Sequence, residues 1–159
     1  MTSPDQTPRH LTDVDALAQL SFLVQATLER RAARAEVSLS LTRLLGILRD
    51  RRPTMYQLAQ LMDLDKSSVT GLVERAERRG LTLRSRSPHD GRSVLVTLTE
   101  EGRALVAQVA AEFGRDIEQL LGALTATDRA ALTEIAERVL ITDAGTRGID
   151  LFATEQSGT

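Results

Sequence analysis

Apolar residues recur at intervals of three and four over most of this sequence, the spacing of helices that bury one face. Four helices are expected in the first half. They run from about Thr12 to Ala35, from Ser38 or Ser40 to Leu48, from a Thr54 cap to Met62, and from an Asp65 cap to Gly80.

After Gly80 the period changes to two, which predicts two strands around Leu83 to Ser85 and Val94 to Leu98. The turn-rich stretch SPHDGR between them predicts a hairpin tip. Two more helices follow: one is capped by Thr99, and one is capped by Thr125 and runs to about Leu140. The fifth helix carries a long apolar stripe formed by Val106, Val109, Phe113, Ile117, Leu120 and Leu124.

Helix, short helix, tight turn, helix and two-stranded hairpin is the order of a winged helix-turn-helix. We therefore predict a mainly α protein with six helices, a two-stranded β-wing and a helical dimerisation region, all in one structural domain. Its expected segments are an N-terminal dimerisation helix (1–37), a DNA-binding lobe (38–98, wing 82–98), long C-terminal dimerisation helices (99–141) and a polar tail (142–159).

The formal charge of the 159 residues is only −2, which by itself argues against a strongly basic nucleic-acid binder. The charge is unevenly spread, however. Residues 43–92 hold 11 basic and 6 acidic side chains, net +5, whereas residues 1–42 carry −1 and residues 93–159 carry −6. A basic centre indicates either a nucleic-acid surface or a solvated basic face.

Several classes of function are disfavoured by composition. Cysteine is absent, and His10 and His89 are far apart in the sequence, so no metal site and no cofactor are expected. We find no phosphate-binding loop and no nucleophile paired with a base, so we do not expect an enzyme. No apolar run is as long as a membrane span, and residues 1–10 do not have the pattern of a signal peptide, so we expect a cytoplasmic protein with no membrane partner.

The fourth helix carries the most informative polar face. Its apolar residues share one side, and the other side presents Ser67, Gly71, Glu74 and Arg78, flanked by Ser68, Thr70 and Arg75. Small hydroxyl side chains suit a helix in a DNA major groove, and a glycine allows close approach to DNA. Glu74 is expected to pair with Arg78. An ordinary solvent-facing helix is the alternative interpretation.

The predicted hairpin adds three arginines, Arg84, Arg86 and Arg92. Asp90 lies two residues from Arg92, and a guanidinium held by a neighbouring carboxylate is suited to a narrow minor groove. A turn aspartate beside a solvated arginine is the alternative here.

Residues 54–105 carry these motifs together: TMYQLAQLMDLDKSSVTGLVERAERRGL followed by the wing RSRSPHDGRSVLVTLTEEG. In order and spacing this stretch closely resembles the MarR family of bacterial transcription regulators. The resemblance implies a homodimer that binds a pseudo-palindromic operator in double-stranded DNA. It further implies that Ser67, Ser68 and Thr70 read the major groove, Lys66 and Arg75 contact phosphates, Thr54 and Gln57 brace the backbone, and Arg92, oriented by Asp90, enters the minor groove.

Apolar residues near both chain ends exceed what a small winged lobe needs, so we expect both ends to wind around a second copy; a larger monomeric helical core is the alternative. The resemblance also implies a small, often anionic and aromatic effector, for which Phe22, Ile47 and Phe113 are candidate lining residues, each also suited to a plain core.

The leading hypothesis is therefore a dimeric repressor released by an effector. One alternative is an activator of the same fold, or a regulator without small-molecule input. A helical protein-interaction module that does not bind DNA is an alternative from another class, and it would not need Arg92.

Overall fold

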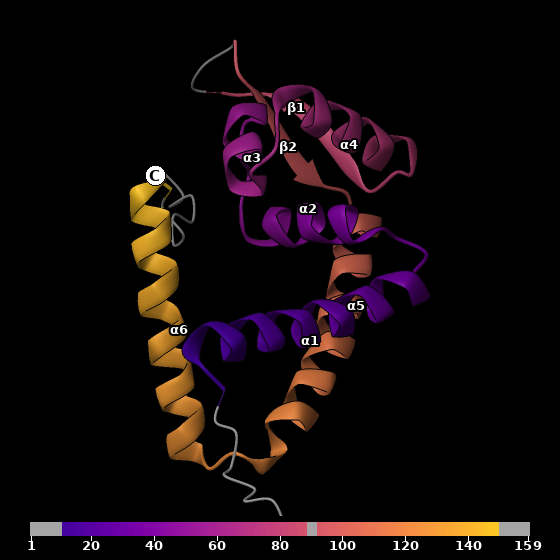
Figure 1. Ribbon diagram of the computed structural model, residues 1–159. Helices are drawn as coiled ribbons and strands as arrows, with labels where there is room; N and C mark the ends of the chain where they lie inside the picture. The colour runs from indigo at the N-terminus through magenta and orange to yellow at the C-terminus, as the bar shows by residue number, and fades with distance from the viewer. Residues whose placement is uncertain (1–10, 89–91, 150–159) are drawn as a thin grey trace, which may run out of the picture.

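The computed structural model describes residues 11–88 and 92–149 (Figure 1). In these residues the helices are α1 (Asp13–Arg34), α2 (Leu39–Asp50), α3 (Met55–Met62), α4 (Lys66–Arg78), α5 (Glu100–Leu120), the short 3₁₀ helix η1 (Leu121–Ala123) and α6 (Ala126–Thr146). Strands β1 (Thr82–Arg86) and β2 (Val94–Leu98) form one antiparallel sheet. The predicted fold class, a mainly α winged helix-turn-helix with six α-helices and a two-stranded wing, is confirmed.

Each α-helix begins at a capping side chain. This side chain accepts a hydrogen bond from a first-turn backbone N–H that has no carbonyl partner within the helix. The side chains of Thr12, Ser38, Thr54, Asp65, Thr99 and Thr125 each accept a hydrogen bond from the backbone N–H three residues further on. The second helix therefore begins after Ser38 rather than Ser40.

Helices α2, α3 and α4 and the wing form a lobe at one end of the molecule (Figure 1). Its centre is apolar, and its largest fully buried aliphatic side chains are Leu44, Leu45, Leu58, Val69, Val73 and Val96. The wing pairs in the register Thr82↔Leu98 to Arg86↔Val94. Strand β2 also holds the start of α3, because the Val96 N–H donates to the Pro53 carbonyl at 3.0 Å and Thr54 bridges to Leu95.

Helix α5 leaves this lobe through a tight junction. The Thr99 hydroxyl donates to the Gly80 carbonyl at 2.6 Å, and the Thr99 N–H donates to the Leu81 carbonyl at 3.1 Å. Gly102 lies so close that a Cβ atom there would be 2.1 Å from the Leu81 oxygen. The backbone of α5 is therefore pressed against the end of the turn that follows α4.

The long helices extend away from the lobe, with α1 lying across α5 and α6 standing apart (Figure 1). Arg129 ties the start of α6 to the end of α5 through Glu118 and the Leu121 carbonyl. Beyond that start, α6 makes no extensive contact with any other helix or strand in residues 11–88 and 92–149. Its large apolar side chains are correspondingly exposed, namely Leu132, Ile135, Val139, Leu140 and Ile141, whereas Ala144 is buried.

Helix α6 continues to Thr146, beyond the helix end expected near Leu140, so the first residues of the predicted polar tail are helical. Polar residues do not end an exposed helix, and the Thr142 hydroxyl donates back to the Arg138 carbonyl at 2.8 Å as helical threonines do. The chain turns at Gly148, whose φ of +64° lies in the left-handed region.

We predict that Gly102→Ala destabilises the protein by about 1–3 kcal/mol, because its methyl group must displace the Leu81 carbonyl or shift α5. Urea unfolding followed by circular dichroism measures the change. Gly114→Ala is the matched control, since nothing lies within 4 Å of a Cβ atom at that position of α5. Equal stability of the two variants would contradict the tight junction.

Candidate nucleic-acid interface

Helix α4 presents one apolar and one polar face, as its sequence predicts. Val69, Leu72, Val73 and Ala76 are at most 4% exposed and pack into the lobe. Lys66, Ser67, Ser68 and Arg75 are exposed on the remaining surface, with Thr70 and Gly71 half-buried. The polar residues expected to face DNA therefore share the outer side of α4.

The Asp65 carboxylate organises the first turn of α4. It accepts hydrogen bonds from the Ser67 hydroxyl, from the Ser68 hydroxyl at 2.6 Å and from the Ser68 N–H at 2.9 Å. These bonds, led by that from Ser67, hold the pKa of Asp65 well below its usual range. Asp65 therefore stays ionised at neutral pH, and both serine side chains are oriented toward it.

The start of α3 is held by a reciprocal pair of bonds. The Thr54 N–H donates to Gln57 Oε1 at 2.8 Å, and the Gln57 N–H donates to Thr54 Oγ1 at 3.2 Å. This is the capping box that the sequence predicts. The DNA-backbone contacts expected of these two residues stay a prediction.

The wing is attached to α4 through one of its arginines. Arg84 on β1 forms a two-point ion pair with Glu77, with Nη2–Oε2 at 2.7 Å and Nε–Oε1 at 3.1 Å. The prediction that Glu74 pairs with Arg78 is wrong, because no such ion pair forms among the described residues. Instead Glu77, three residues after Glu74, pairs with an arginine of the wing. The periodicity of a single helix could not show this contact, because it joins two elements.

Between α4 and the wing lies a cleft of about 370 Å³ that gathers predicted site residues from both elements. It is lined by Met55, Lys66, Thr70, Arg84, Ser85, Arg86 and Val94. Three of these side chains are cationic, so the cleft attracts anions. Met55, Ser85 and Val94 were not predicted as site residues, and only the spatial approach of α3, α4 and the wing reveals them.

The other predicted residues lie outside this cleft. Ser67, Ser68 and Arg75 occupy the outer surface of α4, and Arg92 is exposed where the described chain resumes before β2. Asp90 lies outside the described residues. A Cβ atom on Gly71 would lie 3.4 Å from Arg75 Nη1, an ordinary contact, so the packing of the lobe does not itself require glycine there.

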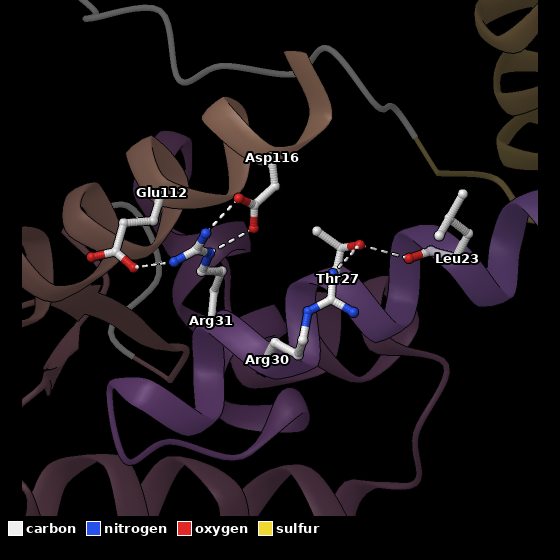
Figure 2. Close-up of polar contacts among 6 residues, drawn as sticks. All are labelled: Leu23, Thr27, Arg30, Arg31, Glu112 and Asp116. Atoms are coloured by element: carbon white, nitrogen blue, oxygen red, sulfur yellow. Dashed lines mark hydrogen bonds and ion pairs between the residues drawn. The ribbon is translucent and has the colours of Figure 1, made fainter. Parts of the chain in front are cut away.

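A second cavity, of about 260 Å³, lies between α1 and α5 and is lined by Thr27, Arg30, Arg31, Asp116, Gln119 and Leu120. Figure 2 shows Arg31 reaching from α1 to two carboxylates of α5, a two-point contact with Asp116 and a 3.3 Å contact with Glu112. The hydrogen bond from Arg31 lowers the pKa of Asp116. Arg30 donates to the Thr27 hydroxyl at 3.0 Å, and that hydroxyl donates to the Leu23 carbonyl (Figure 2).

The three candidate effector residues do not line this second cavity. Phe22 is 62% exposed on α1, Ile47 packs at the edge of the lobe core, and Phe113 is half-buried on α5. Their role in effector binding stays a prediction. The charged residues of the cavity were not predicted from the sequence, because they lie on two helices and the contacting residues Arg31 and Asp116 are 85 positions apart in the chain.

Neither a metal cluster nor a membrane helix is found in the part of the chain that the structure describes. No group of three or more His, Cys, Asp or Glu residues there is placed to hold a metal ion. No helix in the same residues is long and apolar enough to cross a membrane.

Comparisons with known proteins give one consistent result. Residues 37–94 match the MarR family. The HTH-type transcriptional repressor NicR of Pseudomonas putida is 29% identical over 151 residues, which cover 89% of this chain and 95% of that protein.

Solved structures show the same fold. The structure of CouR from Rhodococcus jostii RHA1 bound to p-coumaroyl-CoA has a TM-score of 0.69 at 22% identity, covering 80% of this chain and 91% of that one. The structure of a transcriptional repressor, CouR, bound to a 23-mer DNA duplex has a TM-score of 0.69 at 23% identity, covering 81% of this chain and 92% of that one. Residues 37–94 thus match the MarR family of transcription regulators, and the chain is similar to a transcriptional repressor over most of its length.

Proposed function

We propose that this regulator is a dimeric repressor that places α4 in the major groove of a pseudo-palindromic operator. The observation that carries the proposal is the polar outer face of α4 beside a cationic cleft formed with the wing. Phosphates supply most of the affinity of such proteins, and base edges supply the specificity. Helix α4 offers both kinds of contact, because it carries cationic side chains for phosphates and hydroxyl side chains for base edges.

The proposed roles follow the positions of the residues. Lys66, Arg84 and Arg86 in the cleft contact phosphates, as does Arg75 on the surface of α4. Ser67, Ser68 and Thr70 face base edges, and Gly71 allows close approach. Thr54 and Gln57 brace the DNA backbone from the start of α3. Arg92, together with Asp90, is proposed to enter the minor groove.

The proposed dimer rests on apolar surface that one copy leaves uncovered. Exposed apolar side chains gather on α1 and α6: Val14, Leu17, Leu20, Phe22, Leu23, Ile135, Val139, Leu140 and Ile141 are each more than 40% exposed. A single helix that packs on little else is marginal in water, so α6 needs a partner surface. A second copy supplies one, and a two-fold axis would present two α4 helices to successive major grooves.

We also propose control by a small anionic effector, as the complex of CouR with p-coumaroyl-CoA illustrates for a protein of the same fold. The cavity between α1 and α5 offers Arg30 and Arg31 to an anion. Its volume of about 260 Å³ lies just below the roughly 300–1,000 Å³ of typical ligand sites, which favours a small molecule. An anion there would compete with Asp116 for Arg31.

The segments expected from the sequence complete the proposal. Residues 1–37 and 99–146 serve dimerisation, and residues 38–98 form the DNA-binding lobe, with the C-terminal boundary moved to the observed end of α6. We propose that the protein acts in the cytoplasm and has no enzymatic activity, in keeping with the regulatory names of its relatives.

The central test is binding to an operator selected from a random duplex library, measured by fluorescence anisotropy across a salt series. We expect affinity to fall steeply as salt rises, because phosphate contacts release counterions. Arg92→Ala should weaken binding at least tenfold and leave helicity and the dimer intact. Arg115→Ala, an exposed arginine on α5, is the matched control. Binding that is absent or insensitive to salt would refute the proposed function.

Gly71→Ala separates folding from binding. Because no atom of the lobe forbids a methyl group there, we expect helix stability to rise by up to about 1 kcal/mol while operator affinity falls. Thermal unfolding and anisotropy measure the two effects. Gly114→Ala should show the first effect without the second. Unchanged affinity of Gly71→Ala would show that α4 does not approach DNA closely at this position.

The dimer is tested by Ile135→Glu, which places a charge at a 52% exposed apolar position of α6. We expect a monomer or a dimer weakened at least tenfold, because burying an unpaired carboxylate is costly. Analytical ultracentrifugation measures the dissociation constant of the dimer. Glu137→Ala, on the opposite side of α6, should leave the dimer intact. A wild-type protein that sediments as a monomer would contradict the proposal.

A further inference from the structure

All three hydroxyl groups near the start of α4 donate their single proton within the protein. Ser67 and Ser68 donate to the Asp65 carboxylate. Thr70 donates to the Lys66 carbonyl at 2.8 Å. A carbonyl oxygen and an ionised carboxylate can only accept, so the direction of each bond is fixed by chemistry.

Each of these hydroxyls therefore has only lone pairs left for a further partner. A hydroxyl has one proton and two acceptor sites, and the proton is already used. Asp65 adds more acceptor oxygens to the same surface, and its pKa lies well below the usual range, so it does not gain a proton to donate at neutral pH. The side chains at the start of α4 thus form an acceptor surface, made of Asp65, Ser67, Ser68 and Thr70.

The major groove offers such a surface few partners. Its only hydrogen-bond donors are the exocyclic amino groups of adenine and cytosine, whereas guanine N7 and O6, adenine N7 and thymine O4 are acceptors. Phosphate oxygens are acceptors too. Contacts to all of these acceptors require a donor from the protein.

We propose that the acceptor surface of α4 recognises the exocyclic amino group of adenine or cytosine and that Asp65 fixes this preference by holding the serine protons. The inference rests on the proposed function and deepens it. It assigns two tasks to adjacent side chains: acceptor hydroxyls contact bases, and the cations Lys66, Arg84 and Arg86 of the cleft that Thr70 also lines contact phosphates. Asp65 is a positioning residue in this scheme, since it acts through the serines.

The first experiment probes single atoms of the DNA. The wild-type protein selects its operator from a random duplex library, and each base pair of the site is then replaced by an analogue. Purine in place of adenine removes the N6 amino group, 2-pyrimidinone in place of cytosine removes the N4 amino group, and 7-deazapurines remove N7. Within the α4 footprint we expect loss of an amino group to weaken binding about tenfold and loss of N7 to have no effect.

The second experiment changes the protein. Asp65→Asn keeps a helix cap but replaces one carboxylate oxygen by a donor, which frees a serine proton. We expect the preference for an amino group at the contacted base to fall at least fivefold, with guanine or thymine newly tolerated. Thr70→Val keeps the shape and one methyl group while removing the hydroxyl, and should lose preference at a second position.

The matched control for Thr70→Val is Thr133→Val, because the Thr133 hydroxyl makes the same bond to the carbonyl four residues before it, but on α6. It should leave base preference unchanged. Circular dichroism confirms that each variant is folded before binding is compared.

The outcomes separate the inference from the function beneath it. If no sequence is selected and binding does not depend on salt, the proposed function fails. If an operator is selected but its α4 positions are sensitive to N7 and indifferent to the amino groups, the inference is overturned while the function stands. Unchanged base preference in Asp65→Asn would also overturn it.

Discussion

The contact between Gly102 and the Leu81 carbonyl fixes how the DNA-binding lobe sits on the long helices. Because only a glycine fits there, α5 begins directly against the turn that ends α4. Thr99 reinforces the junction through the carbonyls of Gly80 and Leu81. Through these contacts the start of α5 is joined directly to the end of the turn that follows α4. Under the proposed function, the spacing of the two α4 helices in the dimer therefore depends on the contacts at this junction.

Helix α5 is held again near its other end by the ion pairs of Arg31 with Asp116 and Glu112. These side chains are about one-fifth exposed, so water screens the pairs only partly. An anion changes the equilibrium between two lobe spacings only by binding one of them more tightly. Under the proposed function the Arg31 contact is where such a difference arises, since the anion and Asp116 compete for one guanidinium.

Local signals in the sequence predicted the helices and their starts, because a capping residue and an apolar face are read within a few positions. The polar face of α4 was predictable for the same reason. Contacts between elements were not: Glu77 with Arg84, and Arg31 with Asp116, join positions with no shared periodicity. The late end of α6 was missed because polarity reports solvent exposure rather than the end of a helix.

The basic centre of the chain, residues 43–92, has a net charge of only +5 although it holds 11 basic side chains. Six acidic side chains lie within the basic centre, and two of them have clear structural roles: Asp65 orients serines, and Glu77 holds Arg84 against α4. Each removes some attraction for phosphate, which lowers affinity for all sequences alike. Under the proposed function, Asp65 also fixes serine side chains that face base edges, which affects matched and mismatched sites unequally. Under the proposed function, Asp65 thus reduces general affinity for DNA while it increases discrimination between sequences.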